Sequence, residues 1–328
     1  MGFAAETLIS WTGARVIVTG ATGFLGSQLT RALIERGARV FGLSRRRSSD
    51  LNGNISWLQV DLTDGARVRR LFAEVVPDCV FHLSSLADGR LDRGLVVPIL
   101  HAEVVASVNV LEATADARPR RLVTIGSLEE PESDAPPDSP YAAAKSASRS
   151  YARMYHRLFD VPAVTARVFM TYGPGQPDWK VIPLAARALM SGTSPRINNP
   201  SRLLDWIYVY DVVEALIRTA ETRGIEGQTI DIGSGALTTI GDVVEELRAL
   251  SQSRVPIEFG EAPLPPNRRV VRADLETTSR TLNWRPRVSL KEGLARTLEA
   301  LRSDSVTKCS TALLMFADQL GGLAAGMT

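Results

Sequence analysis

A glycine-rich turn between an apolar strand and a helix is the feature that most restricts how this chain can fold. Residues 16–26 read VIVTGATGFLG, in which the glycines follow an apolar run and open a helical pattern. The first glycine permits a tight turn, the second lets backbone approach a pyrophosphate, and the third lets helix and strand pack closely. Unpaired N–H groups at the helix N-terminus then face the phosphates. The segment predicts a dinucleotide site with contacts from Gly20, Gly23, Phe24, Leu25 and Gly26.

The first half of the chain alternates apolar strands with helical patterns. Continuously apolar strands, each followed by a helix, are typical of a parallel sheet that is covered on both faces. Right-handed crossovers make this a doubly wound α/β sheet, whose ligand crevice lies at the carboxyl ends of the strands. The predicted strands are 15–19, 38–43, 56–60, 79–83, 121–125 and 164–169, and the predicted helices are 23–36, 64–75, 98–117 and 140–159.

The pattern changes after Tyr172, where residues 173–177 (GPGQP) form a turn-rich break. Shorter strands and helices follow, which predicts a smaller α/β lobe that leaves and re-enters the main sheet. We expect a Rossmann domain at 12–173 plus 205–235, a substrate-binding lobe at 174–204 plus 236–302, and a C-terminal tail at 303–328.

Composition excludes several classes of protein. Lys+Arg 38 against Asp+Glu 36 gives a net charge of +2, so no excess charge points to nucleic acid or to an anionic membrane. Two cysteines cannot form a disulfide framework, and the three histidines share no spacing typical of metal ligands. The sequence shows no apolar run near 18 residues and no signal peptide, so we expect a cytoplasmic, metal-free enzyme without a membrane span.

The end of the second predicted strand indicates which nicotinamide cofactor binds. NAD binders commonly place a carboxylate there, but this chain has Ser44, Arg45 and Arg46, with no acid before Asp50. Arginine side chains can hold a 2′-phosphate through charge-assisted forked bonds. We therefore favour NADP(H), with NAD(H) as the alternative. Further candidate contacts, for the adenine and the ribose, are Asp61, Leu62, Leu83 and Ser84.

Residues 140–145 (PYAAAK) place a tyrosine and a lysine four positions apart at the start of a predicted helix. Residues four apart share a helix face, so the Lys145 ammonium should lie near the Tyr141 phenol. A nearby cation lowers the pKa of a phenol, which would let Tyr141 exchange a proton near neutral pH. Ser127, at the end of the fifth strand, could donate a hydrogen bond to the same substrate oxygen. The three side chains predict a proton-transfer site.

Together these segments resemble the extended short-chain dehydrogenase/reductase family of the nucleotide-sugar epimerase/dehydratase type. The resemblance implies an NAD(P)-binding Rossmann domain with a smaller substrate lobe. It also implies that Tyr141 is the acid/base, that Lys145 binds the nicotinamide ribose, and that Ser127 orients a substrate carbonyl or hydroxyl. The resemblance is carried by TGATGFLG (19–26), VDL (60–62), FHLSS (81–85), GSLEE (126–130), SPYAAAK (139–145), YGPGQP (172–177), DWIYVYDVVEAL (205–216) and LNWRPRVSLKEGL (282–294).

Several positions that the family uses for its substrate differ here. The usual asparagines correspond to Glu103 and Met170, and a common arginine corresponds to Leu204, although Arg202 lies two residues earlier. The loop around Lys180 resembles the family's nucleotide-diphosphate loop. The candidate substrate contacts are Ser85, Glu129, Met170, Lys180, Val181 and Arg202.

Glu129 stands where an acid in the 4,6-dehydratase branches of the family removes the C5 proton of the sugar. The spacing between Ser127 and Glu129 also resembles that of 4-keto-6-deoxysugar reductases. The alternative is that Glu129 has a structural role. The preferred hypothesis is hydride transfer at C4 of a nucleotide-activated sugar, with net reduction by NADPH. The alternatives are an NDP-sugar 4-epimerase or 4,6-dehydratase, a ketoreductase on a non-nucleotide natural product, and a cofactor-binding scaffold without activity. The resemblance also implies a homodimer that packs through helices 98–117 and 140–159.

Overall fold

The computed structural model describes residues 9–46, 54–131, 135–261 and 270–304, and these divide into two compact units. The first unit contains residues 9–171, 204–237 and 270–287, and the second contains 172–203, 238–261 and 288–304. The predicted tail at 303–328 lies outside the described residues, apart from its first two positions.

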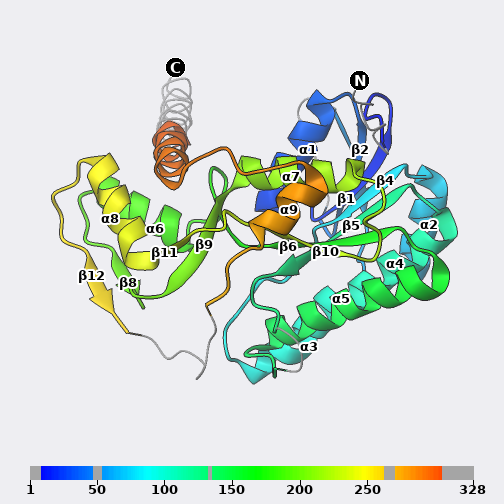
Figure 1. The fold of residues 1–328 in the computed structure, drawn as a ribbon, viewed down its shortest axis with the longest axis horizontal. Helices are drawn as coiled ribbons and strands as arrows, with labels where there is room; N and C mark the ends of the chain where they lie inside the picture. Colours follow the sequence, from blue (N-terminus) through cyan, green and yellow to red (C-terminus); the bar gives the residue numbers. More distant parts are fainter. Residues whose placement is uncertain (1–8, 47–53, 132–134, 262–269, 305–328) are drawn as a thin grey trace, which may run out of the picture. The chain divides into compact units, whose positions relative to one another are not determined.

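The first unit is built on a parallel sheet (Figure 1). The described residues form it in the order β10-β6-β5-β4-β1-β2-β3. Every neighbouring pair in it is parallel, so the predicted doubly wound sheet is confirmed. Because all strands run the same way, their carboxyl ends meet at one edge. The strands are β1 (Arg15–Thr19), β2 (Arg39–Ser44), β3 (Ile55–Gln59), β4 (Cys79–His82), β5 (Arg121–Ser127), β6 (Ala163–Val168) and β10 (Thr229–Ile232).

Helices cover both faces of this sheet, and alternate strand residues point to opposite faces. Val16 and Val18 of β1 pack in one apolar cluster with residues of α1, α7 and α9, whereas Ile17 packs in another with residues of α2, α4 and α5. The covering helices are α1 (Phe24–Glu35), α2 (Gly65–Val75), α4 (Ala106–Ala117), α5 (Pro140–Phe159), α7 (Val209–Glu221) and α9 (Leu275–Leu282).

The start of α5 is defined by local chemistry. The Ser139 hydroxyl accepts a hydrogen bond from the Ala142 N–H at 3.0 Å, and Pro140 occupies the first turn, where its missing N–H has no partner to lose. This cap fixes where the helix begins, and therefore which face of α5 carries Tyr141 and Lys145.

The helical segment before α4 differs from its prediction. It begins at Arg93, not at residue 98, and it passes through η1 (Arg93–Leu95), α3 (Val96–Ile99) and the π-helical turn η2 (Leu100–Val105). Contrary to the expectation from sequence, Arg93–Ala117 is long and apolar enough to match a membrane span by length and composition. In the first unit, however, α4 packs on α2 and α5, and η2 places an acidic side chain in the interior.

The second unit contains α6 (Val181–Met190), α8 (Ile240–Ser251), a helix at 290–304 and the parallel pair β8 (Arg196–Asn198) and β12 (Glu258–Gly260). β8 has three residues, which is too short a stretch for alternation to reveal a strand from sequence. The chain crosses between the units within β7 (Met170–Tyr172), β9 (Leu203–Tyr208) and β11 (Leu237–Thr239).

The predicted lobe at 236–302 is too long, because residues 270–287 belong to the first unit. Leu282 and Trp284 pack in the apolar cluster of the sheet, and the Thr278 hydroxyl donates to the Asp231 carbonyl at 2.7 Å. These contacts hold α9 beside β10.

Candidate active site

The glycine-rich turn has no room for side chains. Gly20 has φ +66°, and a Cβ there would lie 2.8 Å from the Ser84 nitrogen; a Cβ on Gly26 would lie 2.1 Å from the Gly20 oxygen. Gly23 caps α1 without any side-chain hydrogen bond, and Phe24 and Leu25 begin the helix. A glycine cradle below an uncapped helix N-terminus fits a dinucleotide pyrophosphate.

The edge beyond β2 carries two exposed arginines. The Arg45 carbonyl accepts from Gln59 Nε2 at 3.1 Å, and the Ser44 hydroxyl donates to the Arg46 carbonyl at 2.8 Å. These bonds fix the backbone of the turn while both guanidinium groups face solvent. The arrangement leaves the cations accessible to an anion.

Beyond β3, Asp61 accepts hydrogen bonds from the N–H and hydroxyl of Thr63, at 2.9 and 2.8 Å. These bonds, together with the charge of Arg45, hold the pKa of Asp61 below its ordinary value against the effect of burial. Leu62 is buried, and its carbonyl accepts from Asn109 Nδ2 at 2.8 Å. The predicted adenine edge is therefore a rigid turn.

A hydrogen-bonded chain fixes the loop after β4. The Thr19 hydroxyl accepts from the N–H groups of Leu83 and Ser84, each at 3.1 Å, so its single proton goes to His82 Nδ1 at 2.8 Å. Nε2 of His82 then carries the ring proton and donates to Ser107 Oγ at 3.0 Å. This tautomer links β1, β4 and α4.

The structure brings Ser127, Tyr141 and Lys145 together. The Lys145 ammonium lies 5.7 Å from the centre of the Tyr141 ring and donates to the Ile125 carbonyl at 3.0 Å. The side chains of Ser127 and Ser85 lie near the Tyr141 hydroxyl, and both act to lower the pKa of that phenol. Ser127 at the end of β5, Ser85 after β4 and Tyr141 at the start of α5 therefore lie at the same edge of the sheet.

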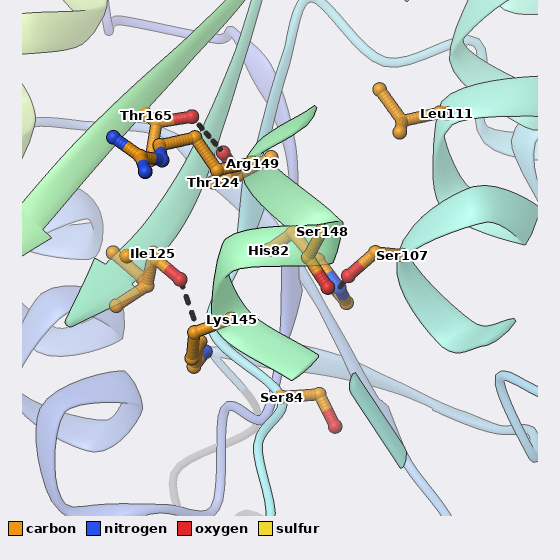
Figure 2. Close-up of a pocket in the computed structure, with 11 residues that line it drawn as sticks. His82, Ser84, Ser107, Leu111, Thr124, Ile125, Lys145, Ser148, Arg149 and Thr165 are labelled. Carbon is orange, nitrogen blue, oxygen red and sulfur yellow. Dashed lines mark hydrogen bonds between the residues drawn. The ribbon is translucent and has the colours of Figure 1, made fainter. Parts of the chain in front are cut away.

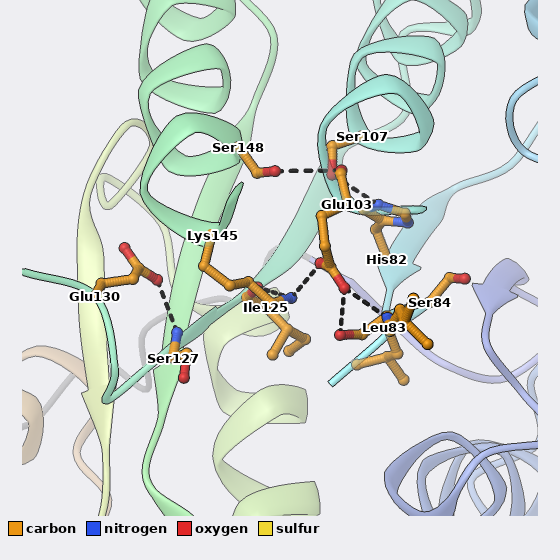
Figure 3. Close-up of polar contacts among 12 residues, drawn as sticks. His82, Leu83, Ser84, Glu103, Ser107, Ile125, Ser127, Glu130, Lys145 and Ser148 are labelled. Atoms are coloured by element: carbon orange, nitrogen blue, oxygen red, sulfur yellow. Dashed lines mark hydrogen bonds and ion pairs between the residues drawn. The ribbon is translucent and has the colours of Figure 1, made fainter. Parts of the chain in front are cut away.

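Glu103, noted from the sequence only as a replacement of the family's usual asparagine, lies beside Lys145 in this site. Its carboxylate lies 2.9 Å from the Lys145 ammonium, and both side chains are buried, with 2% and 4% exposed (Figure 3). The other carboxylate oxygen accepts from the Ser85 hydroxyl and the Leu86 N–H, each at 2.6 Å. Burial raises the pKa of Glu103, but Lys145 and these bonds outweigh it and hold that pKa below its ordinary value.

The expectation that Lys145 lowers the pKa of Tyr141 is wrong as a net effect. Burial raises the pKa of Tyr141 and Glu103 adds to it, so the phenol stays above its ordinary value although Lys145 acts in the opposite direction. The pKa of Lys145 is also raised: burial alone would lower it, but Tyr141 and Glu103 outweigh burial. Tyr141 therefore rests as a phenol beside an ammonium.

The two glutamates after β5 differ in their surroundings. Glu129 is half-buried and its N–H donates to Ser127 Oγ at 3.2 Å. Glu130 is buried, accepts from the Ser127 N–H at 2.7 Å and lies 2.8 Å from Arg149 Nε. Glu130, which the sequence analysis did not single out, therefore holds the end of β5 in place, and Glu129 is the acid nearer to solvent.

The predicted substrate contacts fall in both units. Ser85, Glu129 and Met170 belong to the first unit, where Ser85 lies at the proton-transfer site and Met170 is half-buried at the start of β7. Lys180, Val181 and Arg202 belong to the second unit, where the Lys180 ammonium lies 4.3 Å from the centre of the Trp179 ring and Lys180 caps α6.

Lys145 also borders a small cavity (Figure 2), with a volume of about 10 Å³. Its polar lining comes from β4, α4, β5, α5 and β6. A space of this size holds about one water and not a substrate, so it belongs to the interior side of the site. The polar lining includes His82, Ser107, Thr124, Ser148 and Thr165.

Comparisons with known proteins agree with this geometry. The profile of the family described as "NAD dependent epimerase/dehydratase family" matches residues 16–233. The UDP-glucose 4-epimerase of Mycolicibacterium smegmatis is 31% identical over 89% of this chain and 99% of its own length. The dTDP-glucose 4,6-dehydratase of Xanthomonas campestris is 29% identical over 86% of this chain and 92% of its own.

A solved structure is similar over nearly the same length. The Thermus thermophilus UDP-glucose 4-epimerase in complex with NAD has a TM-score of 0.76 and 26% identity, covering 88% of this chain and 99% of its own.

The buried His82 predicts a loss of stability in acid. Burial lowers the pKa of His82 to about 4, with Lys145 acting in the same direction. The folded protein therefore excludes a proton that the unfolded chain takes up near pH 6.5, so stability falls as the pH drops from about 6.5 to about 4. The contribution is about 3 kcal/mol. Urea unfolding across this range should show it, and a flatter profile is expected for His82→Asn.

The matched control is His101→Gln, which removes an exposed histidine on η2 and should leave the acid-dependent loss unchanged. An equal loss of stability in wild type and His82→Asn would contradict the assignment.

Proposed function

The chain belongs to the NAD-dependent epimerase/dehydratase family, and we propose that it transfers a hydride at C4 of a nucleotide-activated sugar, as an NADPH-dependent 4-ketoreductase. The observation that carries this proposal is the set of Ser127, Tyr141 and Lys145 beside the glycine cradle. When bound, the nicotinamide supplies the hydride. Relatives that act on UDP-glucose and dTDP-glucose support the substrate class.

Ser127, Tyr141 and Lys145 each have a separate role in the proposed carbonyl reduction. Ser127, at the end of β5, donates a hydrogen bond to the carbonyl oxygen, and Tyr141 gives its phenolic proton to the alkoxide that forms there. The Lys145 ammonium stabilises the tyrosinate that remains. Tyr141 rests as the phenol, which is the form that a reduction consumes.

The choice of NADP(H) rests on the edge beyond β2. Arg45 and Arg46 are exposed there, and β2 ends in Ser44, without a carboxylate that could accept from a ribose hydroxyl. A 2′-phosphate would take charge-assisted bonds from the guanidinium groups. NAD(H) is the alternative, supported by the NAD in the Thermus relative.

Removing the two arginines tests the cofactor. The double variant Arg45→Ala/Arg46→Ala should bind NADPH about tenfold more weakly or worse, since each lost charge-assisted bond costs about 1.5–3 kcal/mol when fully formed. NADH binding should change little, and Arg31→Ala, an exposed arginine on α1, is the control. Fluorescence titration measures the affinities for NADPH and NADH. Tighter binding of NADH than of NADPH by the wild type would defeat the proposal.

Removing the proton donor tests the mechanism. Tyr141→Phe should lower the reduction of a nucleoside-diphosphate 4-keto-6-deoxysugar about 10²–10⁴-fold while NADPH still binds. Tyr210→Phe, on an exposed position of α7, should keep full activity. Consumption of NADPH, followed by absorbance, measures the rate. Full turnover by Tyr141→Phe would refute the role of the phenol.

A 4-epimerase or 4,6-dehydratase is the second candidate, because the relatives carry these activities and because Glu129 is an acid beside Ser127. Such an enzyme keeps its cofactor through the cycle. Protein that purifies with a nicotinamide and converts UDP-glucose or dTDP-glucose without added NADPH would favour this candidate over the reductase. Glu129→Gln that blocks elimination but not hydride transfer would identify a dehydratase.

We also propose a homodimer. Val104 and Leu111, which the sequence placed on the contact helix, are buried in the subunit, but exposed apolar side chains remain on α3, η2 and α5. Sedimentation should give the mass of two 35.6 kDa chains, and Val97→Asp should shift it toward one chain. A single chain at micromolar concentration would oppose the proposal. The exposed apolar residues are Val96, Val97, Leu100, Tyr151, Leu158 and Phe159.

A further inference from the structure

The carboxylate of Glu103 is the one acid in direct contact with the Lys145 ammonium among the described residues. We propose that Glu103 is a positioning residue: it fixes the Lys145 ammonium, balances its charge and so holds Tyr141 as the phenol that donates a proton. The statement that Tyr141 donates its proton in a carbonyl reduction rests on the proposed function. The statement that Glu103 keeps Tyr141 protonated does not.

Among the described residues, the structure shows acceptors for two of the three N–H groups of Lys145. An ammonium has three N–H groups; one goes to the Ile125 carbonyl at 3.0 Å and one to the Glu103 carboxylate at 2.9 Å. The third remains for a hydroxyl of the cofactor ribose. Because both protein acceptors are fixed in the interior, Glu103 aims that third N–H as well as balancing the charge.

Glu103 is itself held in place from two sides. One oxygen accepts from the Ser85 hydroxyl and the Leu86 N–H, each at 2.6 Å, and the backbone carbonyl of Glu103 accepts from Ser148 at 3.2 Å. The π-helical turn η2 carries the residue, and such turns are frequent at functional sites. The carboxylate therefore cannot turn away from Lys145 without losing buried hydrogen bonds.

The other charged groups around the cluster are already balanced. His82 on β4 is neutral at pH 7, because burial lowers its pKa to about 4. Glu130 after β5 pairs with Arg149 of α5 at 2.8 Å, and Arg167 of β6 pairs with Asp231 of β10 at 2.6 Å.

Lys145 and Glu103 together thus carry no net charge next to Tyr141. Loss of the Tyr141 proton adds a negative charge to a neutral, buried cluster, and this is unfavourable. Burial raises the pKa of Tyr141 most, Lys145 acts against burial, and Glu103 adds to it. With Glu103 uncharged, the ammonium would oppose burial alone, so the pKa of Tyr141 should fall.

The experiment is an alkaline absorbance titration of the full-length chain, read as the difference between each protein and its Tyr141→Phe version, so that the other tyrosines cancel. In the wild type, Tyr141 should titrate above the ordinary value of about 10. Glu103→Gln should increase the ionisation constant of Tyr141 about tenfold. Glu103→Asp, which keeps the charge, should restore most of the wild-type titration.

Asp116→Asn is the matched control, because it removes a carboxylate from the exposed face of the adjoining α4 and should leave the titration unchanged. An unchanged titration in Glu103→Gln, or an equal change in Asp116→Asn, overturns the proposal. If Glu103→Gln does not fold, the titration of the wild type still tests the proposal. A pKa of Tyr141 below the ordinary value in the wild type also overturns the proposal.

The rate of reduction gives a second reading. With NADPH and a nucleoside-diphosphate 4-keto-6-deoxysugar, the alkaline limb of kcat should move to lower pH in Glu103→Gln by about as much as the titration does. If the titration of Tyr141 shifts in Glu103→Gln but the alkaline limb of its kcat profile does not, Glu103 does not act on the reaction through Tyr141. Absence of reduction in the wild type, with the titration as expected, would instead refute the proposed reductase.

Discussion

A buried ammonium determines how the carboxyl edge of this sheet is arranged. Lys145 is 4% exposed, and an uncompensated charge in that position would cost several kcal/mol. Its compensation comes from Glu103 on η2 and the Ile125 carbonyl on β5. Removing one partner of such a pair typically costs about 3–5 kcal/mol, which is large against a total stability of about 5–15 kcal/mol. Two elements distant in sequence, η2 and β5, are therefore tied to one side chain of α5.

The parallel sheet makes this arrangement possible. β1, β4 and β5 are neighbours, so the turn at Gly20, the loop at Ser85 and the end of the strand at Ser127 lie at the same edge. Each segment is then fixed by its own bonds: Thr19 holds the loop after β4, and Glu130 holds the backbone of Ser127. The cofactor cradle and the proton-transfer site thus share one rigid support.

The sequence was sufficient for the sheet and for the trio of Ser127, Tyr141 and Lys145, because strand periodicity and helix spacing are local signals. It was not sufficient for the charge balance. Glu103 lies 42 positions before Lys145 (145 − 103), and only the packing of η2 on α5 brings the two together. Two signals were available in the sequence: an acid replaces the asparagine usual at this position, and an acid in an otherwise apolar helix requires a partner when it is buried.

Burial is the main reason why the pKa of Tyr141 is raised and not lowered, and the contact with Glu103 adds to the effect of burial. The spacing of Tyr141 and Lys145 on one helix face indicates a cation beside a phenol. The counter-charge, the Glu103 carboxylate, is distant in sequence and does not appear in that local pattern. Asparagine, usual at this position in the family that the sequence resembles, would offer Lys145 a dipole, whereas Glu103 offers a full charge. The same three side chains can therefore lie in different electrostatic surroundings, and a residue outside the trio contributes to the pKa of the proton donor. What distinguishes this site is thus the electrostatic setting of its proton donor, and not the identity of the donor.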